Sequence, residues 1–217
     1  MRKFILPIAA CFVCSAISSQ DLQFVENKGQ WDQQVKFKTL IGAGAVFLQQ
    51  NGYRVILNNP KELVAISNYL SGHTTGKAEV NKLILHSHAY QEAFLGAAAN
   101  PDIVTEGELE TYNNYFVGSD LSKWTNHCRI FNVITYKNVY PGIDVRYYTQ
   151  NHHLEYDFVV HPGADIRKIR MRVDGVDELN LSNGDLVVKT SVGEVQQEKP
   201  VGFVQTNNKT SAVDVQY

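Results

Sequence analysis

Residues that could do chemistry are concentrated between His153 and Asp157. His153, Glu155 and Asp157 occupy alternate positions, so in a β-strand all three side chains point to one face. Two carboxylates and an imidazole can bind a divalent cation or act in acid–base catalysis. Neighbours two positions apart on a strand lie roughly 7 Å apart, which is wide for one small ion. The pattern therefore favours a polar sheet face over a metal site, and no cofactor is expected.

A second kind of chemistry is recognition of sugars. An exposed tyrosine ring offers a sugar an apolar face and a polar tip, and glycosidases hold two carboxyl groups about 5–10 Å apart. The candidate residues for carbohydrate binding or glycan hydrolysis are Tyr140, Tyr148, Glu155 and Asp157. The alternative is that the aromatic rings pack in the core, which we favour most clearly for Trp124 and Tyr115.

Two further pairs invite a chemical interpretation. His86 and His88 would share one strand face as a zinc pair, but the sequence supplies no third ligand. His127 and Cys128 are adjacent, so on a strand their side chains point to opposite faces and a buried, inert thiol is favoured. The nucleophile elbow, the phosphate-binding loop and the metalloprotease helix motif are absent from the sequence. We therefore predict no catalytic residue and no enzymatic activity.

The N-terminus has the pattern of a signal peptide. Arg2 and Lys3 precede an apolar run from Phe4 to Cys14, and small polar residues follow to Gln20. The run is shorter than the roughly 20 residues that span a bilayer. We predict that residues 1–20 are a signal peptide, with cleavage after Ser18 or Gln20, and that the protein is secreted or displayed at the cell surface. A buried N-terminal strand or helix is the alternative.

Cysteine and charge restrict the class further. Cys11 resembles a lipidation site but follows a very short apolar core, so a lipoprotein is disfavoured. Without the leader only Cys128 remains, so the fold must be held by its own core. The chain has 20 basic and 22 acidic residues, which disfavours nucleic acid as a partner. The basic run from Arg167 to Arg172 alternates with apolar residues, as expected of a solvated strand face.

The elements that must position these residues are mostly strands. The spacing of apolar runs and turn residues predicts an all-β domain over residues 21–217, an antiparallel β-sandwich or related fold, with one helix near residues 60–70. Asn51-Gly52 predicts a hairpin, Asn59-Pro60 starts the helix, and 94–110 is predicted to be a loop. Residues 23–29 are predicted to be an exposed lead-in. The other expected strands are 35–40, 83–90, 130–136, 143–148, 153–160, 166–173, 186–190, 194–197 and 201–205.

The C-terminal residues continue a strand pattern. Val213, Val215 and Tyr217 alternate with polar residues. Either this is a terminal edge strand, or the chain is the first part of a longer protein, which we favour. No segment after the leader is long and apolar enough to anchor the chain in a membrane.

Four segments resemble motifs of a known protein family. Residues 24–31 are similar to its opening ENxGQW motif, and residues 114–124 to NYFxGxDxxKW. Residues 139–148 are similar to VYPGIDxxYY, and residues 154–165 to LEYDFxVxPGAD. The order is kept from Phe24 to Pro200.

The family that these motifs resemble is a domain of unknown function at the N-terminus of large secreted bacterial proteins. Its members are typical of gliding bacteria and often continue into propeller-type β repeats and a sorting domain for type IX secretion. The resemblance implies an extracellular module with no established activity and no catalytic residue. Its partners would be surface glycans or other surface proteins. This sequence contains neither the repeats nor the sorting domain, which puts the type IX route in doubt.

Overall fold

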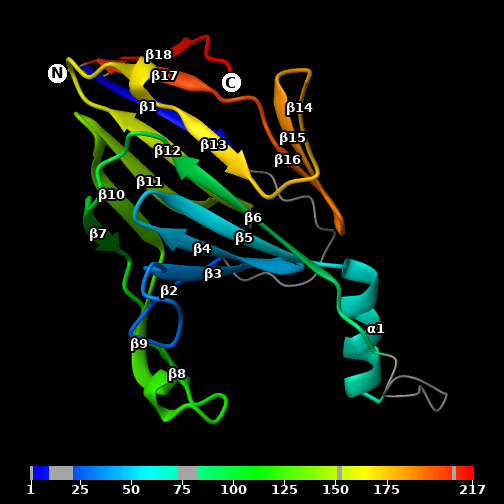
Figure 1. The fold of residues 1–217 in the computed structure, drawn as a ribbon. Helices are drawn as coiled ribbons and strands as arrows, with labels where there is room; N and C mark the ends of the chain where they lie inside the picture. Colours follow the sequence, from blue (N-terminus) through cyan, green and yellow to red (C-terminus); the bar gives the residue numbers. More distant parts are fainter. Residues whose placement is uncertain (1, 10–21, 73–82, 151–152, 207–208) are drawn as a thin grey trace.

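The protein folds mainly into antiparallel sheets, as the sequence predicts. The computed structural model describes residues 2–9, 22–72, 83–150, 153–206 and 209–217. Two large sheets face each other across the core, and a small sheet and one helix lie at the periphery (Figure 1). The predicted all-β, sandwich-like class is confirmed.

Sheet A has seven strands in the order β18-β17-β1-β12-β11-β10-β7. Its longest hairpin joins β11 to β12 in continuous register from Ile143↔Val160 to Gln150↔His153. Its strands are β1 (Arg2–Ala9), β7 (Asp102–Glu106), β10 (Val133–Tyr140), β11 (Ile143–Gln150), β12 (His153–Val160), β17 (Gly202–Thr206) and β18 (Lys209–Val213).

Sheet B has eight strands in the order β13-β6-β5-β4-β3-β2-β9-β8. The predicted Asn51-Gly52 hairpin is confirmed, with Gln49 opposite Gly52. The strands are β2 (Phe24–Glu26), β3 (Phe37–Ile41), β4 (Gly44–Gln49), β5 (Gly52–Asn58), β6 (Ser87–Phe94), β8 (Tyr112–Tyr115), β9 (Thr125–Phe131) and β13 (Met171–Asp174). Short 3-10 turns, η2 (Leu121–Lys123) and η3 (Ile166–Lys168), precede β9 and β13.

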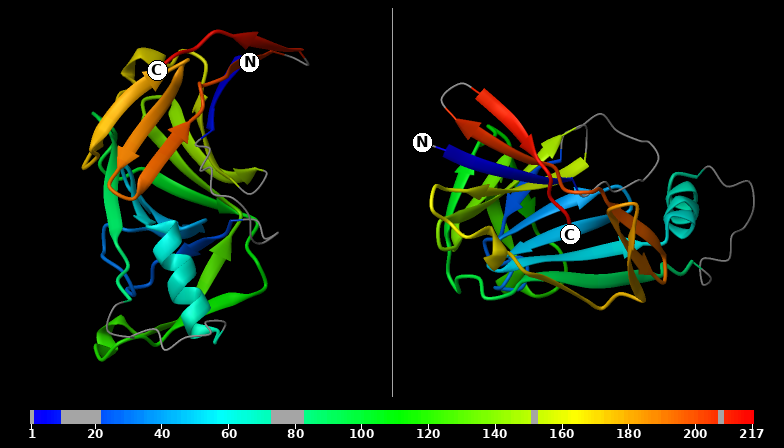
Figure 2. Two further views of the ribbon diagram at one scale, coloured as in Figure 1. Left: turned by 90° about the vertical axis from the view of Figure 1, so that its right-hand side faces the viewer. Right: turned by 90° about the horizontal axis from the view of Figure 1, so that it is seen from above.

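A small third sheet stands beside these two. It consists of β14 (Glu178–Ser182), β15 (Asp185–Thr190) and β16 (Gly193–Gln197) in the order β14-β15-β16. Two views show it rising next to the end of sheet A (Figures 1 and 2). Val188 and Val195 bury their side chains in the main core, so the small sheet is part of the same folded unit.

The predicted helix is also confirmed. Helix α1 (Pro60–Leu70) begins at Asn59, whose side chain accepts hydrogen bonds from the backbone N–H groups of Lys61 and Glu62. Proline at the first helical position loses no hydrogen bond, because that N–H has no partner within a helix. None of the residues of α1 is buried. The helix therefore extends from the body with Val64 and Leu70 exposed and Leu63, Ile66 and Tyr69 only partly buried.

The core between the sheets is rich in tyrosine. The ring of Tyr53 from sheet B packs edge-on against Tyr147 and Tyr156 from sheet A, with centroids 6.2 and 5.9 Å apart. Phe94 and Phe158 make a similar contact at 5.5 Å. Edge-to-face pairs of this kind each add about 0.5–1.5 kcal/mol to the burial of the rings. The buried aromatic side chains therefore hold the two sheets together.

Several predicted elements are wrong in detail. The lead-in at residues 23–29 contains β2, and Phe24 is fully buried. The predicted loop at 94–110 contains β7, which pairs with β10. The strand expected at 130–136 is split between β9 and β10 at Asn132, and the strand expected at 83–90 begins only at Ser87. The small strand β14 was not predicted.

The N-terminal residues lie in a strand. β1 pairs with β12 from Phe4↔Val160 to Ala9↔Glu155, and with β17 from Arg2↔Thr206 to Ile5↔Phe203. Arg2–Ala9 is also the start of the predicted signal peptide, so the leader stays a prediction. Cys11 and the cleavage positions Ser18 and Gln20 lie outside the described residues.

The other terminus also lies on sheet A. β18 is the end strand of this sheet, paired only with β17 among the described strands. β18 ends at Val213 and residues 214–217 lie in no strand, so the edge strand that the alternation of Val213, Val215 and Tyr217 suggested does not form.

The strand expected at 166–173 is wrong in its first half, because Arg167 and Lys168 lie in the 3-10 turn η3. Only from Met171 does β13 show the expected alternation, with Arg172 exposed while Met171 and Val173 pack against the core.

Candidate functional site

The β11–β12 hairpin brings three of the predicted site residues together. Tyr148 is paired with Glu155, and Arg146 with Asp157, in the antiparallel register. Paired residues on neighbouring strands point to the same face. The alternate residues Tyr147, Tyr156 and Phe158 enter the core, so this row lies on the outer face of sheet A. We call Tyr148, Glu155 and Asp157 the acidic cluster.

The hydroxyl of Tyr148 links the two carboxyl groups. Its Oη lies 3.1 Å from Glu155 Oε2 and 3.1 Å from Asp157 Oδ1. The accepting oxygens are therefore no more than twice 3.1 Å apart. The hydroxyl has one proton, so it donates to one carboxylate at a time. The guanidinium carbon of Arg146 lies 4.9 Å from the centroid of the Tyr148 ring, a cation–π contact that fixes the ring.

The electrostatics of the cluster follow from partial burial. Desolvation raises the pKa of Glu155, and the charge of Asp157 raises it further. Desolvation also raises the pKa of Asp157, against the opposing effects of the Tyr148 hydrogen bond and of Arg146. Burial beside two carboxylates raises the pKa of Tyr148 well above its ordinary value. The cluster thus holds protons more tightly than free side chains do, which is useful for acid–base chemistry.

The third member of the predicted metal triad stays outside the cluster. His153 acts on Glu155 only through its charge, which lowers the pKa of that carboxyl. Across the part of the chain that the structure describes, no group of three or more His, Cys, Asp or Glu side chains is arranged to hold a metal ion. His153, Glu155 and Asp157 are therefore not brought together as a metal site.

Tyr140 does not belong to a glycan platform. Its ring is buried, with 2% of its surface exposed. Its hydroxyl donates to the carbonyl of Arg170 at 3.0 Å and accepts from the Arg170 N–H at 3.4 Å. Its role is to fasten the segment before β13 to the end of β10. The prediction that Tyr140 lines a carbohydrate site is wrong, because its strand position points into the core.

Asp144 has the structural role that the sequence suggested. Its carboxylate accepts from the Asn138 N–H at 2.8 Å, and from Lys137 Nζ and His161 Nε2 at 2.9 Å each. Burial opposes ionisation, but these donors outweigh it and lower the pKa of Asp144. Asn138 has a φ of 52° where the β10–β11 register shifts. Asp144 therefore holds an irregular strand in place.

The histidine and cysteine candidates have separate partners. His86 Nδ1 lies 2.8 Å from Glu62 Oε1, whereas His88 contacts Ser191 Oγ at 2.9 Å and the Gly175 carbonyl at 2.6 Å. They do not form a zinc pair. Cys128 is fully buried, and burial raises the pKa of its thiol. The inert-thiol interpretation agrees with this environment.

A surface that the sequence reasoning missed lies at the end of the β8–β9 projection. Phe116, Val117, Leu121 and Trp124, which we call the apolar tip, are 57%, 77%, 67% and 43% exposed. The Phe116 and Trp124 rings meet edge-on at 5.7 Å, and Trp124 Nε1 donates to the Gly118 carbonyl at 3.2 Å. The prediction that Trp124 is a core residue is therefore wrong. No local signal separates Trp124 from Tyr115, because both flank the Gly118-Ser119-Asp120 turn and only Tyr115 packs against a core cluster.

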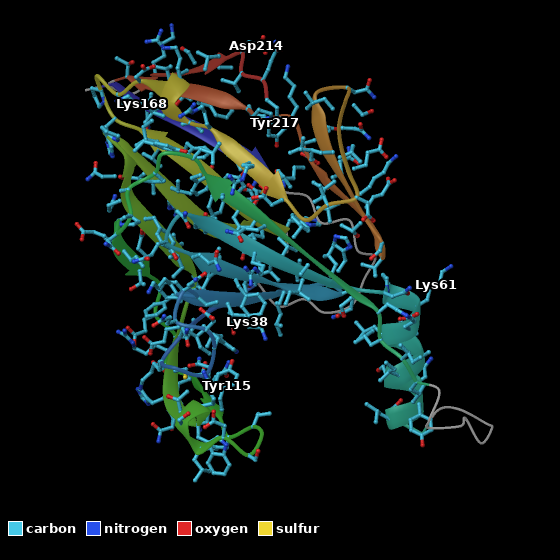
Figure 3. The ribbon with its side chains drawn as sticks, in the orientation of Figure 1. Lys38, Lys61, Tyr115, Lys168, Asp214 and Tyr217 are labelled. Carbon is cyan, nitrogen blue, oxygen red and sulfur yellow. The ribbon has the colours of Figure 1, made fainter. Side chains whose placement is uncertain are left out.

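The base of this projection is packed. Tyr115 lies there, visible in Figure 3, with its ring 5.3 Å from that of Trp31. Trp31 also contacts Phe47, and Lys38 Nζ lies 5.4 Å from each of these two rings. Tyr115 is partly buried against a second core cluster of Val25, Cys128 and Ile130, in line with the core role expected of it. The packed residues Tyr115 and Trp31 therefore fix the position of the apolar tip.

A shallow pocket of about 80 Å³ lies near the start of α1. Its lining includes Ile41, Leu57, Pro60 and Val195. The pocket is small and lies away from the acidic cluster, whose residues do not line it.

Among the described helices none is long and apolar enough to cross a membrane.

Comparison with known proteins gives one match. The model of a family described as Domain of unknown function (DUF7948) matches residues 24–217. The chain belongs to this family. No match was found among curated proteins or among solved structures.

Within this DUF7948 domain, residues of the quoted motifs build turns. Asn27 accepts from the N–H groups of Gly29 and Trp31 and donates to the carbonyls of Asp32 and Val35. Asp120 accepts from the Ser122 N–H at 3.0 Å to start the 3-10 turn of the tip. Asp144 holds the bend before β11 in the same way. These motif residues thus have structural roles, and the apolar tip is the exposed exception.

Proposed function

We propose that this chain is an exported, non-enzymatic β module that makes contacts outside a bacterial cell, in adhesion, assembly or spacing. The observation that carries the proposal is the apolar tip. A soluble protein rarely leaves several large apolar side chains clustered at one exposed point unless they meet a partner. The packing of Tyr115 against Trp31 holds the tip in place and leaves the tip itself exposed.

Other features support this function. The leader pattern of residues 1–20 supports export, and membership of a family without a described activity gives no reason to assume catalysis. The resemblance to N-terminal domains of large secreted proteins supports a place at the cell surface, ahead of further domains. The partner would be a surface protein or a surface glycan, with no nucleic acid and no cofactor involved.

Binding of the labelled protein to washed bacterial cells tests the proposal. The variant Phe116→Ser with Trp124→Ser should lose most of the binding while keeping its melting temperature, because neither residue belongs to a core cluster. The matched control is Leu181→Ser, which removes an exposed leucine from β14 in the small sheet. Equal binding by the tip variant and the control would contradict the proposal.

The acidic cluster favours a second candidate, a carbohydrate-binding or glycan-hydrolysing domain. Two of its carboxyl oxygens lie no more than twice 3.1 Å apart, a limit that admits the separation of about 5–5.5 Å in retaining glycosidases. The raised pKa values of both carboxyl groups suit proton transfer. Tyr148, Glu155 and Asp157 would be its residues. A glycan array and a reducing-sugar assay test it with Glu155→Gln and Asp157→Asn. Turnover or glycan binding that both variants abolish would favour this candidate over the tip-mediated contact.

A further inference from the structure

β1 fills a slot in the middle of sheet A. It pairs with β12 on one side and with β17 on the other. In the strand order of the described residues, β17 and β18 join the sheet only through β1. Figure 2 shows β1 (blue) lying beside the β17–β18 hairpin (red). Without β1, the facing edges of β12 and β17 lose their hydrogen-bonding partner.

The residues of β1 are those that the leader pattern marks for removal. Unpaired strand edges bind other extended chains, since every free N–H and C=O group is a ready partner. We propose that, after the leader is removed, the slot between β12 and β17 receives an extended segment of another protein, running antiparallel to both strands. This inference rests on the export that the proposed function requires.

The inner side of the slot demands apolar residues. Tyr156, Phe158 and Val160 of β12 are 1%, 0% and 4% exposed and face the core. The register positions opposite them in β1 carry Ile8, Leu6 and Phe4. An incoming strand therefore needs large apolar residues at three alternate positions to keep this part of the core dry.

The outer side demands positive charge. The intervening positions of β12 carry Glu155 and Asp157, which stand opposite Ala9 and Pro7 of β1. Neither of those β1 residues offers a positive charge. Lysine or arginine at these positions of an incoming strand would lie directly across from the carboxylates, where opposite charges stabilise a cross-strand pair. The occupant is thus a segment that alternates apolar and basic residues.

The chain's own end strands do not fit this description. β18 runs in the same direction as β1, since both are antiparallel to β17, but Lys209–Val213 offers no run of three alternate apolar residues. Among the other end strands of the described sheets, β7, β8, β14 and β16 also lack such a run. Ile169, Met171 and Val173, at and just before β13, do alternate with arginines, but β13 is already paired with β6 in sheet B. A second copy could donate residues 169–173 only by giving up the pairing of β13 with β6. This favours a different protein as the source.

The test uses the full chain, exported by a bacterial host and purified after processing, with its N-terminus determined by mass spectrometry. The probe is a peptide that repeats Phe-Lys-Leu-Lys-Ile-Lys, matching the apolar positions of β1 and placing lysine opposite Glu155 and Asp157. The control peptide has the same composition in blocks, Lys-Lys-Lys-Phe-Leu-Ile. Fluorescence anisotropy measures binding, and hydrogen exchange measures protection of β12 and β17.

We expect a processed chain that begins after residue 18, binds the alternating peptide at least about tenfold more tightly than the block peptide, and gains protection in both strands. The double variant Glu155→Gln with Asp157→Asn should bind the alternating peptide more weakly than the wild type does. Its affinity for a peptide in which serine replaces each lysine should equal that of the wild type. A chain that still begins at Met1 would overturn the inference, and also the export on which it rests. If β12 and β17 of the processed chain are already protected from hydrogen exchange without peptide, or if two copies pair there, the slot proposal is wrong while export still holds.

Discussion

Glu92 and Gln197 lie 105 residues apart in the sequence and are hydrogen-bonded in the core, with Gln197 Nε2 donating to Glu92 Oε1. The other oxygen of Glu92 accepts from Tyr53 Oη at 2.6 Å. Both side chains are 0% exposed. Because Glu92 belongs to β6 and Gln197 to β16, this contact ties the small sheet to sheet B at the level of the core.

This carboxyl predicts an unusual dependence of stability on pH. Desolvation raises the pKa of Glu92 from 4.5 to about 7, despite the opposing hydrogen bonds from Tyr53 and Gln197. The folded state therefore binds the proton more tightly than the unfolded chain does. The contribution of Glu92 to stability is fully present below pH 4.5 and is lost as the pH rises through about 7.

Chemical denaturation of the wild type and of Glu92→Gln between pH 4.5 and 8 checks this. The difference in unfolding free energy should change by about 3 kcal/mol across the range, in favour of the variant at high pH. The groups around Glu92 are tyrosines: Tyr53, Tyr90, Tyr147, Tyr156 and Tyr217. Tyrosines stay neutral at these pH values. A constant difference would contradict the assignment.

Removing the hydroxyl of Tyr148 should alter the acidic cluster measurably. Tyr148→Phe deletes the donor that lowers the pKa values of Glu155 and Asp157, so both carboxyl groups should titrate at higher pH than in the wild type. Carboxyl ¹³C NMR measures the two titrations. Tyr112→Phe, which alters an exposed ring, is the control. Unchanged titrations would show that the Tyr148 hydrogen bonds do not form.

Asp144→Asn should destabilise the fold at neutral pH. The substitution removes a carboxylate that accepts three hydrogen bonds, two of them from the side chains of Lys137 and His161. Hydrogen bonds to charged groups contribute about 1.5–3 kcal/mol each to stability, and asparagine keeps one acceptor oxygen, so we expect a loss of about 2 kcal/mol in urea unfolding at pH 7. Asp214→Asn, at an exposed carboxylate, should stay within about 0.5 kcal/mol. Equal losses of unfolding free energy in Asp144→Asn and Asp214→Asn would contradict the structural role of Asp144.

Gly52 should tolerate no side chain. Its φ is 144°, and an added Cβ would lie 2.0 Å from the Glu92 carbonyl oxygen. Gly193 has a φ of 148° with nothing within 4 Å of such an atom. Both alanine variants incur the backbone strain of about 1–3 kcal/mol, but only Gly52→Ala adds the collision. Thermal unfolding should rank it clearly below Gly193→Ala, and the reverse order would refute the close approach of β5 and β6.

The sequence predicted the parts of the fold whose signals are local. The hairpin at Asn51-Gly52 and the cap at Asn59 depend on a few adjacent residues. β7 and the break at Asn132 depend on pairing between Asp102–Glu106 and a distant strand, which no local pattern reveals. Of the carbohydrate-site residues, Tyr148, Glu155 and Asp157 came together because their strand periodicity was recognised correctly. Tyr140 failed because its position faces the core.

The exposure of the apolar tip could not be predicted from the local sequence. The same aromatic residues serve as core in one strand and as exposed surface in another, and only tertiary packing decides which. Tyr115 and Trp124 flank the same turn, yet Tyr115 packs against Trp31 while Trp124 remains 43% exposed. The two projections, α1 and β8–β9, both extend away from sheet A in two views (Figures 1 and 2).

The most direct test of a contact module is photo-crosslinking from the tip. A photoreactive phenylalanine at position 116 should form a covalent adduct with a cell-surface macromolecule when the protein is irradiated on intact cells. The same group at position 181, an exposed site on the small sheet, should give little adduct. Strong adducts at position 181 and none at position 116 would contradict the account.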